Sequence, residues 1–347
     1  MHNMRLHDNM LVIRSKNSNL WLVFLYLQKG YKAMEYRKPM PDFLCAAART
    51  PTLQRLKGIG MHCSCQYTDF PMFRCLYPYS RFDHSLAVAR ILWDFTGDPV
   101  QALAGLLHDA ATPVFSHVVD FLNSDHLAQE STEKGLWDII KNDTALMAAL
   151  GGIVPEAVAD CGRYPLADCP SPRLCADRLE YTLSNGIHYS FSKNVQPMYD
   201  ALAVDVNEDG IEELVFTSAQ TALDFADMAL ACGKVYVCDE DRYAMERLSK
   251  LLKKALEENI ITWQDLYTDE PQVIHKLPKE NWESFCRLTR VFRVGGPGEF
   301  SYRVIAKKRY IDPLVRDRGR VSVLFPEFKE RMEEFRTCSQ DYYICAE

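Results

Sequence analysis

The 347-residue sequence lacks a long apolar run. The strongest one near the start, LWLVFLYL at residues 20–27, is far shorter than the roughly 20 residues that a membrane-spanning helix needs. The stretch behind it, QKGYKAMEYRKPMP, offers no small-residue cleavage site and so does not resemble a secretory signal. We therefore expect a cytoplasmic protein with no membrane partner, in which residues 1–40 form an N-terminal extension.

Long basic blocks and paired C-x-x-C motifs are also missing. The chain has 40 Lys and Arg against 47 Asp and Glu, a formal net charge of -7, so a nucleic-acid polymer is not expected as a partner. A small phosphorylated ligand needs only a few local cations and is still compatible with this charge. The 12 cysteines show no zinc-ribbon spacing, and we interpret them as reduced thiols.

The remaining composition is that of a folded protein, with 48% hydrophobic and 25% charged residues. Apolar residues recur at helical spacing through residues 41–200, which predicts a helical domain. The region 201–347 is mixed and begins with a hairpin around the Asp-Gly turn of ALAVDVNEDGIEELVF. The expected helices lie at 41–60 (broken at Pro51), 84–95, 100–109, 114–123, 129–150, 154–160, 171–185, 217–232, 239–258 and 325–335, and the late strands at 298–315 and 319–325.

Four ionisable residues occupy positions where these helices should bury apolar side chains. His84 shares a helix face with Val88 and Leu92, and His108 with Asp109 ends the apolar run of the next helix. Asp177 shares a third face with Leu174 and Tyr181. Buried carboxylates are normally paired or bound to metal, and a set of two imidazoles and two carboxylates suits Mn, Fe, Ni, Co, Zn or, less well, Mg. The pattern therefore predicts one divalent metal ion held by three helices.

The order H…HD…D, with these flanking residues, resembles the HD superfamily of metal-dependent phosphohydrolases, closest to its deoxynucleoside triphosphate triphosphohydrolase branch. The matching stretches are TPTLQRLKGIG (50–60), SRFDHSLAVA (80–89), AGLLHDAATPVFSH (104–117), ADRLEY (176–181) and AKKRYIDPLV (306–315). The resemblance implies a mainly α fold, in which an HD-domain helical core precedes a smaller C-terminal α/β appendage.

The same resemblance implies roles for individual residues. His84, His108, Asp109 and Asp177 would be the metal ligands. Arg81 would hold a phosphate, His117 would face the phosphates, and Tyr181 would contact the sugar. His117, or His126 if it enters the site, would act as general acid or base, with Glu130 and Glu133 as further candidates for proton transfer or as exposed charges.

Three departures separate the chain from the triphosphohydrolases. The family's HD-x-G-H-G-P-F-S-H reads HDAATPVFSH, so Ala111 replaces a glycine and Thr112 replaces a histidine. A further family histidine aligns with either His126 or Gln129-Glu130, and Asn185 replaces an aspartate. The expected function is a phosphohydrolase acting on a small phosphate ester, plausibly a nucleotide or deoxynucleotide. The alternatives are a phosphodiesterase of the same superfamily and a non-catalytic nucleotide-binding regulator, and the resemblance also raises the expectation of a homo-oligomer.

Three other motifs are weaker candidates for a binding site. DVNEDG at 205–210 begins like a calcium loop, but Phe216 stands where the bidentate glutamate is required. The glycines of VGGPGEF lack the strand-then-helix setting of a nucleotide loop. Two interpretations of Lys307, Lys308 and Arg309 stay open: an anion site near a subunit contact, or a solvated strand edge.

Overall fold

The computed structural model describes residues 34–346 except 75, 77 and 123–134. The predicted acid–base candidate His126 lies outside the described residues, as do Glu130 and Glu133. Within the described part the chain is mainly helical, with small sheets later in the sequence, which confirms the expected fold class. None of the described helices has the length and apolar character needed to cross a membrane.

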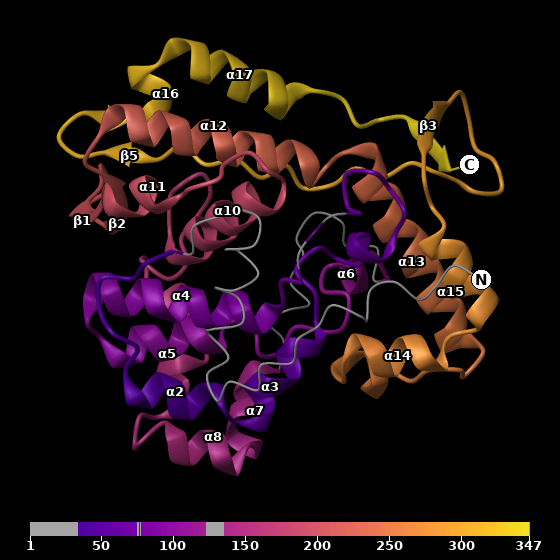
Figure 1. The fold of residues 1–347 in the computed structure, drawn as a ribbon, viewed down its shortest axis with the longest axis horizontal. Coiled ribbons are helices and arrows are strands. Elements are labelled where there is room, and N and C mark those ends of the chain that lie inside the picture. The colour runs from indigo at the N-terminus through magenta and orange to yellow at the C-terminus, as the bar shows by residue number, and fades with distance from the viewer. Residues whose placement is uncertain (1–33, 75, 77, 123–134, 347) are drawn as a thin grey trace.

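In the first half of the described chain all the named elements are helices (Figure 1). It contains α2 (Asp42–Ala48), α3 (Pro51–Arg55), η1 (Leu56–Gly58), η2 (Cys65–Tyr67), α4 (Arg81–Thr96), α5 (Pro99–Leu107), α6 (Val118–Leu122), α7 (Leu136–Asn142), α8 (Thr144–Ala149), α9 (Pro155–Val158), η3 (Cys161–Arg163), α10 (Ala176–His188) and α11 (Gln196–Asp200).

Capping residues determine where the two central helices begin and end. Ser80 and Asp83 form a reciprocal capping box that starts α4, and Gly97 ends it in the left-handed region at φ 66°. Asp98 then accepts a hydrogen bond from the Val100 amide at the start of α5. The turn between α4 and α5 is therefore very short, and the two helices pack against each other.

Gly105 allows a close contact between α4 and α5. A Cβ atom at this position would lie 2.3 Å from Leu92 Cδ1 and 3.1 Å from Val88 Cγ1, both on α4. Only a residue without a side chain fits at that separation. The close approach matters because His84 and His108 lie on these same two helices.

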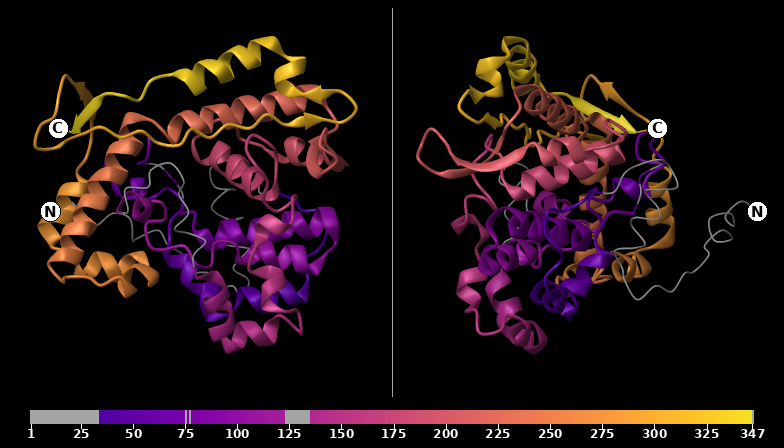
Figure 2. Two further views of the ribbon diagram at one scale, coloured as in Figure 1. Left: turned by 180° about the vertical axis from the view of Figure 1, so that it is seen from behind. Right: turned by 60° about the vertical axis from the view of Figure 1, so that its left-hand side comes forward.

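The second half combines long helices with two small sheets. Its elements are β1 (Leu202–Val206), β2 (Glu212–Phe216), α12 (Ala219–Val235), α13 (Asp239–Glu257), η4 (Gln264–Tyr267), α14 (Glu270–Lys276), α15 (Lys279–Cys286), β3 (Val291–Val294), β4 (Ser301–Tyr302), β5 (Leu314–Val315), β6 (Gly319–Arg320), α16 (Val321–Leu324), α17 (Pro326–Thr337) and β7 (Tyr343–Ala346). The sheet orders are β1-β2-β5-β6 and β3-β7-β4. Seen from the front and from behind, α12 runs between α10 and α17, and the two sheets lie at opposite ends of the molecule (Figures 1 and 2).

The predicted hairpin is confirmed, with Leu202 opposite Phe216 and Val206 opposite Glu212. The predicted strand over 298–315 is wrong for most of its length, because only β4 and β5 pair at its ends. The backbone between them lies against helices: Arg242 donates to the Val304 carbonyl, and the Arg309 carbonyl lies 2.2 Å from where a Cβ of Gly233 would be. The predicted strand over 319–325 is also mostly wrong, since the Asp312 carboxylate accepts from the Ser322 amide at 2.8 Å and starts α16.

Several predicted helices differ in their limits, and the one predicted at 114–123 begins only at Val118. In the described part of 129–150 the chain forms α7 and α8, because Asp143 leaves helical geometry and accepts a hydrogen bond from the Leu146 amide. The helix predicted at 171–185 begins later, at Ala176. Cys175, just before it, has extended backbone angles of φ -130° and ψ 173°.

Two hydrophobic clusters fill the interior. One surrounds α4, α5, α10 and α12 and takes in Phe216 and Phe335. The other surrounds α6, α13 and α15 and takes in Phe70 and Phe115. Both clusters draw residues from either side of residue 200, so the helical half and the mixed half share their cores.

We expect Gly105→Ala to lower the free energy of unfolding by about 1–3 kcal/mol, because the added methyl group overpacks the contact with Leu92 and Val88. Denaturant unfolding would measure the change. Gly295→Ala is the matched control, since a Cβ atom there meets nothing within 4 Å and the backbone does not require glycine. Equal stability of the two variants would contradict the close contact between the helices.

Candidate active site

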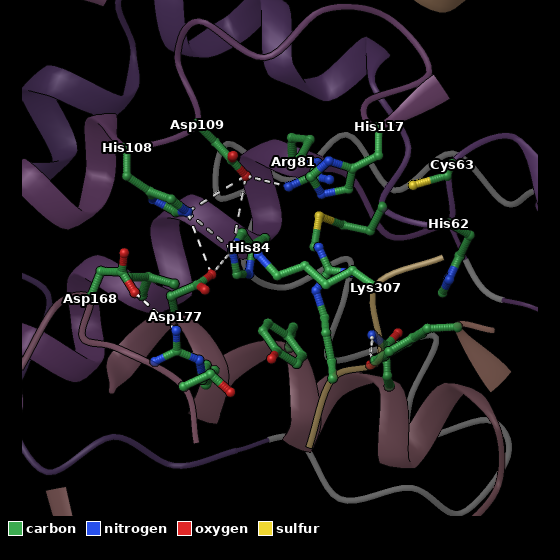
Figure 3. Close-up of a pocket in the computed structure, with 18 of the residues that line it drawn as sticks. His62, Cys63, Arg81, His84, His108, Asp109, His117, Asp168, Asp177 and Lys307 are labelled. Atoms are coloured by element: carbon green, nitrogen blue, oxygen red, sulfur yellow. Dashed lines mark hydrogen bonds and ion pairs between the residues drawn. The ribbon is translucent and has the colours of Figure 1, made fainter. Parts of the chain in front are cut away.

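A cavity of about 490 Å³ lies where the two halves of the chain meet. Helices α4, α5 and α10 line one end, and the start of α13 and the segment 306–310 line other parts of its wall. The predicted site residues within the described part all line this cavity (Figure 3): Arg81, His84, His108, Asp109, His117, Asp177 and Tyr181. The fold therefore brings together residues that are up to a hundred positions apart in the sequence.

The two histidines present their Nε2 atoms to each other. His84 Nε2 and His108 Nε2 are 3.2 Å apart. His108 Nδ1 lies 2.7 Å from the Gly105 carbonyl oxygen, which can only accept, so Nδ1 carries the proton and Nε2 of the neutral ring has a lone pair. This nitrogen is therefore available to bind a cation in the space between the two rings.

Two carboxylates complete the group. Asp177 Oδ1 lies 3.0 Å from His84 Nε2 and 3.7 Å from His108 Nε2. Asp109 Oδ2 lies 3.9 Å and 3.6 Å from the same two nitrogens. Ligands about 2.1 Å from one ion and about 90–110° apart are separated by about 3.0–3.4 Å, so these four side chains need only small movements to surround a cation. His84, His108 and Asp109 form a group with spacing suited to a metal ion.

Arg81 and Thr112 hold Asp109 in place. Arg81 Nη1 donates to Asp109 Oδ2 at 2.9 Å, and the Thr112 hydroxyl donates to Asp109 Oδ1 at 2.9 Å. Burial alone would raise the pKa of Asp109, but the Arg81 guanidinium together with His108 and His84 outweighs burial and holds that pKa far below its usual range. The threonine that replaces the family's histidine thus orients a carboxylate and does not line the cavity.

The loop after α5 is shaped by contacts from distant segments. Arg55 Nη2 donates to the carbonyls of Ala110 and Thr112, both at 2.8 Å. Phe115 and Ser116 adopt left-handed backbone angles, with φ 58° and 53°. Ser116 Oγ accepts from Arg81 Nε at 3.0 Å, which leaves Arg81 Nη2 without a hydrogen bond to any residue in the described ranges.

His117 follows this turn and is held by Asp120. Its Nδ1 lies 2.9 Å from Asp120 Oδ2, and the Asp120 side chain is 1% exposed. Burial lowers the pKa of His117 and the Asp120 carboxylate only partly opposes the effect. A neutral His117 that donates from Nδ1 has a free lone pair on Nε2.

Glu180 was not identified from the sequence, although it lies one turn after Asp177 in ADRLEY. Its Oε2 makes a short hydrogen bond to His84 Nδ1 and another to the Tyr79 hydroxyl, and Ser184 donates to its Oε1 at 2.7 Å. Histidines that bind metal usually donate their second ring nitrogen to such a carboxylate. The i, i+3 spacing of Asp177 and Glu180 is the sequence feature that points to this pair.

The structure also brings residues to the cavity that the sequence analysis left undecided or missed. Lys307, Lys308 and Arg309 line it, and they do not lie on a strand. Lys308 Nζ donates to the Arg336 carbonyl at 2.8 Å, near the end of α17. His62, Asp168, Arg178 and Asp241 line the cavity as well, and no local sequence pattern marks any of them.

We expect Glu180→Gln to lower the pKa of His84 in chelator-treated protein. Burial opposes the charged imidazole, but Glu180 and Asp177 outweigh it and raise the pKa of His84 to about 10. Removing one carboxylate charge should therefore let His84 lose its proton at lower pH, which an NMR titration of the ring nitrogens would record. Ser184→Ala is the control, because it removes a hydrogen bond to Glu180 and keeps the charge; an unchanged titration in Glu180→Gln would refute the role of Glu180.

The chain is similar in sequence to two curated proteins. No protein-family model matches the chain. It is 27% identical over 283 residues to the uncharacterized protein YdhJ of Bacillus subtilis, an alignment that covers 77% of this chain and 82% of YdhJ. It is 25% identical over 313 residues to the metal-dependent phosphohydrolase cns2 of Cordyceps militaris, covering 82% and 84% of the two chains.

Two solved structures share the fold. A phosphohydrolase from Bacteroides thetaiotaomicron matches with a TM-score of 0.57 at 16% identity, over 91% of this chain and 98% of that one. A hypothetical protein from Aquifex aeolicus matches with a TM-score of 0.59 at 17% identity, over 88% and 93%. The chain is therefore similar in sequence to a metal-dependent phosphohydrolase and shares its fold with a solved phosphohydrolase.

Proposed function

We propose that this protein hydrolyses a small phosphate ester, a nucleotide or deoxynucleotide, with the help of one divalent metal ion. The observation that carries the proposal is the convergence of two imidazole nitrogens and two carboxylates at one end of a cavity that Arg81 and His117 also line. The deoxynucleoside triphosphate triphosphohydrolases provide the nearest family pattern for such a substrate.

The donor set fits a metal ion of the first transition row. His84, His108, Asp109 and Asp177 would hold it, with two nitrogen and two oxygen ligands that suit Mn, Fe, Co, Ni or Zn better than Mg. Glu180 would keep His84 oriented with Nε2 toward the ion. Such an ion would supply charge neutralisation at the phosphate and lower the pKa of a coordinated water.

Arg81 would bind and orient the phosphate. Its Nε and Nη1 are engaged by Ser116 and Asp109, which fix the guanidinium plane, and Nη2 is left for an anionic oxygen. A guanidinium fixed in this way stabilises charge that develops on the phosphoryl oxygens without having to reorganise.

His117 would accept the proton of the attacking water. The Asp120 carboxylate holds Nδ1, and burial keeps the pKa of the ring below its usual value, so Nε2 is unprotonated near neutral pH. The proton taken by His117 could then pass to the leaving oxygen of the ester. Tyr181, on the same face of α10 as Asp177, would contact the sugar of a nucleotide.

The departure at Thr112 motivates the competing function, a nucleotide sensor without turnover. Thr112 is turned toward Asp109, so the position offers no imidazole to the cavity. In the sensor the metal and nucleotide would bind, and His117 would have no proton to move. A phosphodiesterase of the same superfamily would share the metal ligands and differ in the product released.

We expect His108→Ala to lose both bound metal and phosphate release, because it removes one of two nitrogen ligands. Elemental analysis of purified protein gives the metal per chain, and a panel of nucleotides gives released phosphate or pyrophosphate. His275→Ala is the control, since His275 is exposed on α14. Full metal content in His108→Ala would overturn the proposed ligand set.

We expect His117→Gln to retain metal and to lose about 100-fold or more in kcat, since positioned acid–base catalysis contributes a factor of this size. Asp120→Asn should cost less, because it leaves the imidazole present but less firmly oriented. Steady-state kinetics at saturating manganese would separate the two. Tight nucleotide binding by wild-type protein with no product would favour the sensor.

A further inference from the structure

Glu270 is a buried carboxylate on α14 that the proposed chemistry does not use. It is the first residue of that helix and is 2% exposed. Its Oε1 accepts hydrogen bonds from two backbone amides, those of Gly60 at 2.9 Å and Phe115 at 3.3 Å. The Tyr67 hydroxyl donates to its Oε2 at 2.6 Å. One side chain of the mixed half thus joins two loops of the helical half that lie far apart in the sequence.

Both loops lead directly into the candidate active site. The Ile59 carbonyl, on the first loop, accepts from the Arg81 amide at 2.8 Å. The second loop reaches the cavity at His117, two residues after Phe115. Glu270 itself is not among the described residues that line the cavity. Its hydrogen-bonded connection to the site therefore runs through the two loops.

Hydrogen bonds also connect these loops to the side chain of Arg81. The Ser116 hydroxyl donates to the Gly60 carbonyl at 3.3 Å and accepts from Arg81 Nε at 3.0 Å. A displacement of Gly60 or Phe115 would therefore move Ser116, and with it one of the two contacts that fix the guanidinium plane. Glu270 binds the amides of both residues that would have to move.

The turn at Phe115 and Ser116 needs such support. Both residues have left-handed backbone angles, with φ 58° and 53°, which are costly for a residue that has a side chain. Phe115 is fully buried, and its ring centroid lies 6.1 Å from that of Trp282 and 6.5 Å from that of Tyr67. A buried amide without an acceptor would add a further cost, and Glu270 supplies the acceptor. Contacts from distant residues thus hold a conformation that the local sequence does not favour.

We propose that Glu270 is a positioning residue for the phosphate end of the cavity, which holds Arg81 and His117 in place through the turn at 115–116. The proposal rests on the function proposed above, and it adds a residue outside the cavity on which that function depends. Each hydrogen bond uses the carboxylate as an acceptor, so its reach matters more than its charge.

The test compares three substitutions of Glu270 in the full chain. Glu270→Gln keeps an oxygen for the two amides and should behave like wild type. Burial raises the pKa of Glu270, and its hydrogen bonds and Arg81 only partly oppose this, so a neutral side chain suits the position. Glu270→Asp draws the oxygens back by one methylene, and Glu270→Ala removes the acceptor. We expect all three to retain metal, and kcat to fall by about 10-fold in Glu270→Asp and about 100-fold in Glu270→Ala, since a misplacement of about 1 Å can cost that much.

An NMR titration of the His117 ring gives a readout that does not require turnover. Burial lowers the pKa of His117 in the wild-type protein, where the ring faces Asp120, Arg81 and Arg309. A loosened turn would expose the ring and move its pKa back toward the ordinary value. We expect the largest shift in Glu270→Ala, a smaller one in Glu270→Asp and none in Glu270→Gln.

Val273→Ala is the matched control for loosening of the helix. Val273 is fully buried on α14 and apolar, so this change weakens the packing of the helix and keeps the carboxylate. It should lower stability and leave the His117 titration unchanged. An equal shift in Val273→Ala would mean that Glu270 only stabilises the fold, which would overturn the proposal.

An unchanged His117 titration in Glu270→Ala would also overturn it, as would a Glu270→Gln variant as impaired as Glu270→Asp. If Glu270→Ala does not fold, the order of the Gln and Asp variants decides. These results are distinct from failure of the proposed function. If the titrations follow the expected order but the wild-type protein hydrolyses no phosphate ester, the positioning stands and the hydrolase does not. If esters are hydrolysed with equal kcat by all variants, only the positioning falls.

Discussion

The contact between α4 and α5 at Gly105 is the constraint on which the metal end of the cavity depends. Val88 and Leu92 of α4 occupy the space that a side chain at position 105 would fill. His84 lies one turn before Val88, and His108 lies just after Gly105, so the same approach that buries these apolar groups brings the two Nε2 atoms to 3.2 Å. Gly105 also accepts the His108 Nδ1 hydrogen bond, so one residue determines both the spacing and the orientation of a ligand.

Around these histidines each buried charge lies beside a group of opposite charge. Arg81 neutralises Asp109, and His84 lies between Glu180 and Asp177. Buried charges are costly unless they are paired and hydrogen-bonded, and each of these has at least one close partner. In the metal-free protein the raised pKa of His84 places a proton in the position where a divalent cation would lie. The same geometry that binds a proton therefore prepares the site for a metal.

The cavity has two chemically different ends. Cationic and imidazole groups gather near the metal ligands, where an anionic phosphate would lie. The wall at the start of α13 presents Asp241 near a group of tyrosines, and Lys307, Lys308 and Arg309 line the same cavity. The mixed half of the chain forms part of this cavity, because the start of α13 and the segment 306–310 complete walls that the helical half only begins.

The sequence alone determined the helical class and the inward-facing set His84, His108, Asp109 and Asp177, because apolar spacing assigns each residue to a helix face whatever its neighbours. It also predicted the hairpin, whose turn is local. It did not reveal Glu180, His62 or Asp241, because nothing near them in the chain marks them as facing a shared cavity. Residue preferences predict a strand over 298–315, and they do not state whether the neighbouring backbone is a strand or a helix. Only the tertiary structure decided which side chains meet, because that depends on the packing of helices far apart in the sequence.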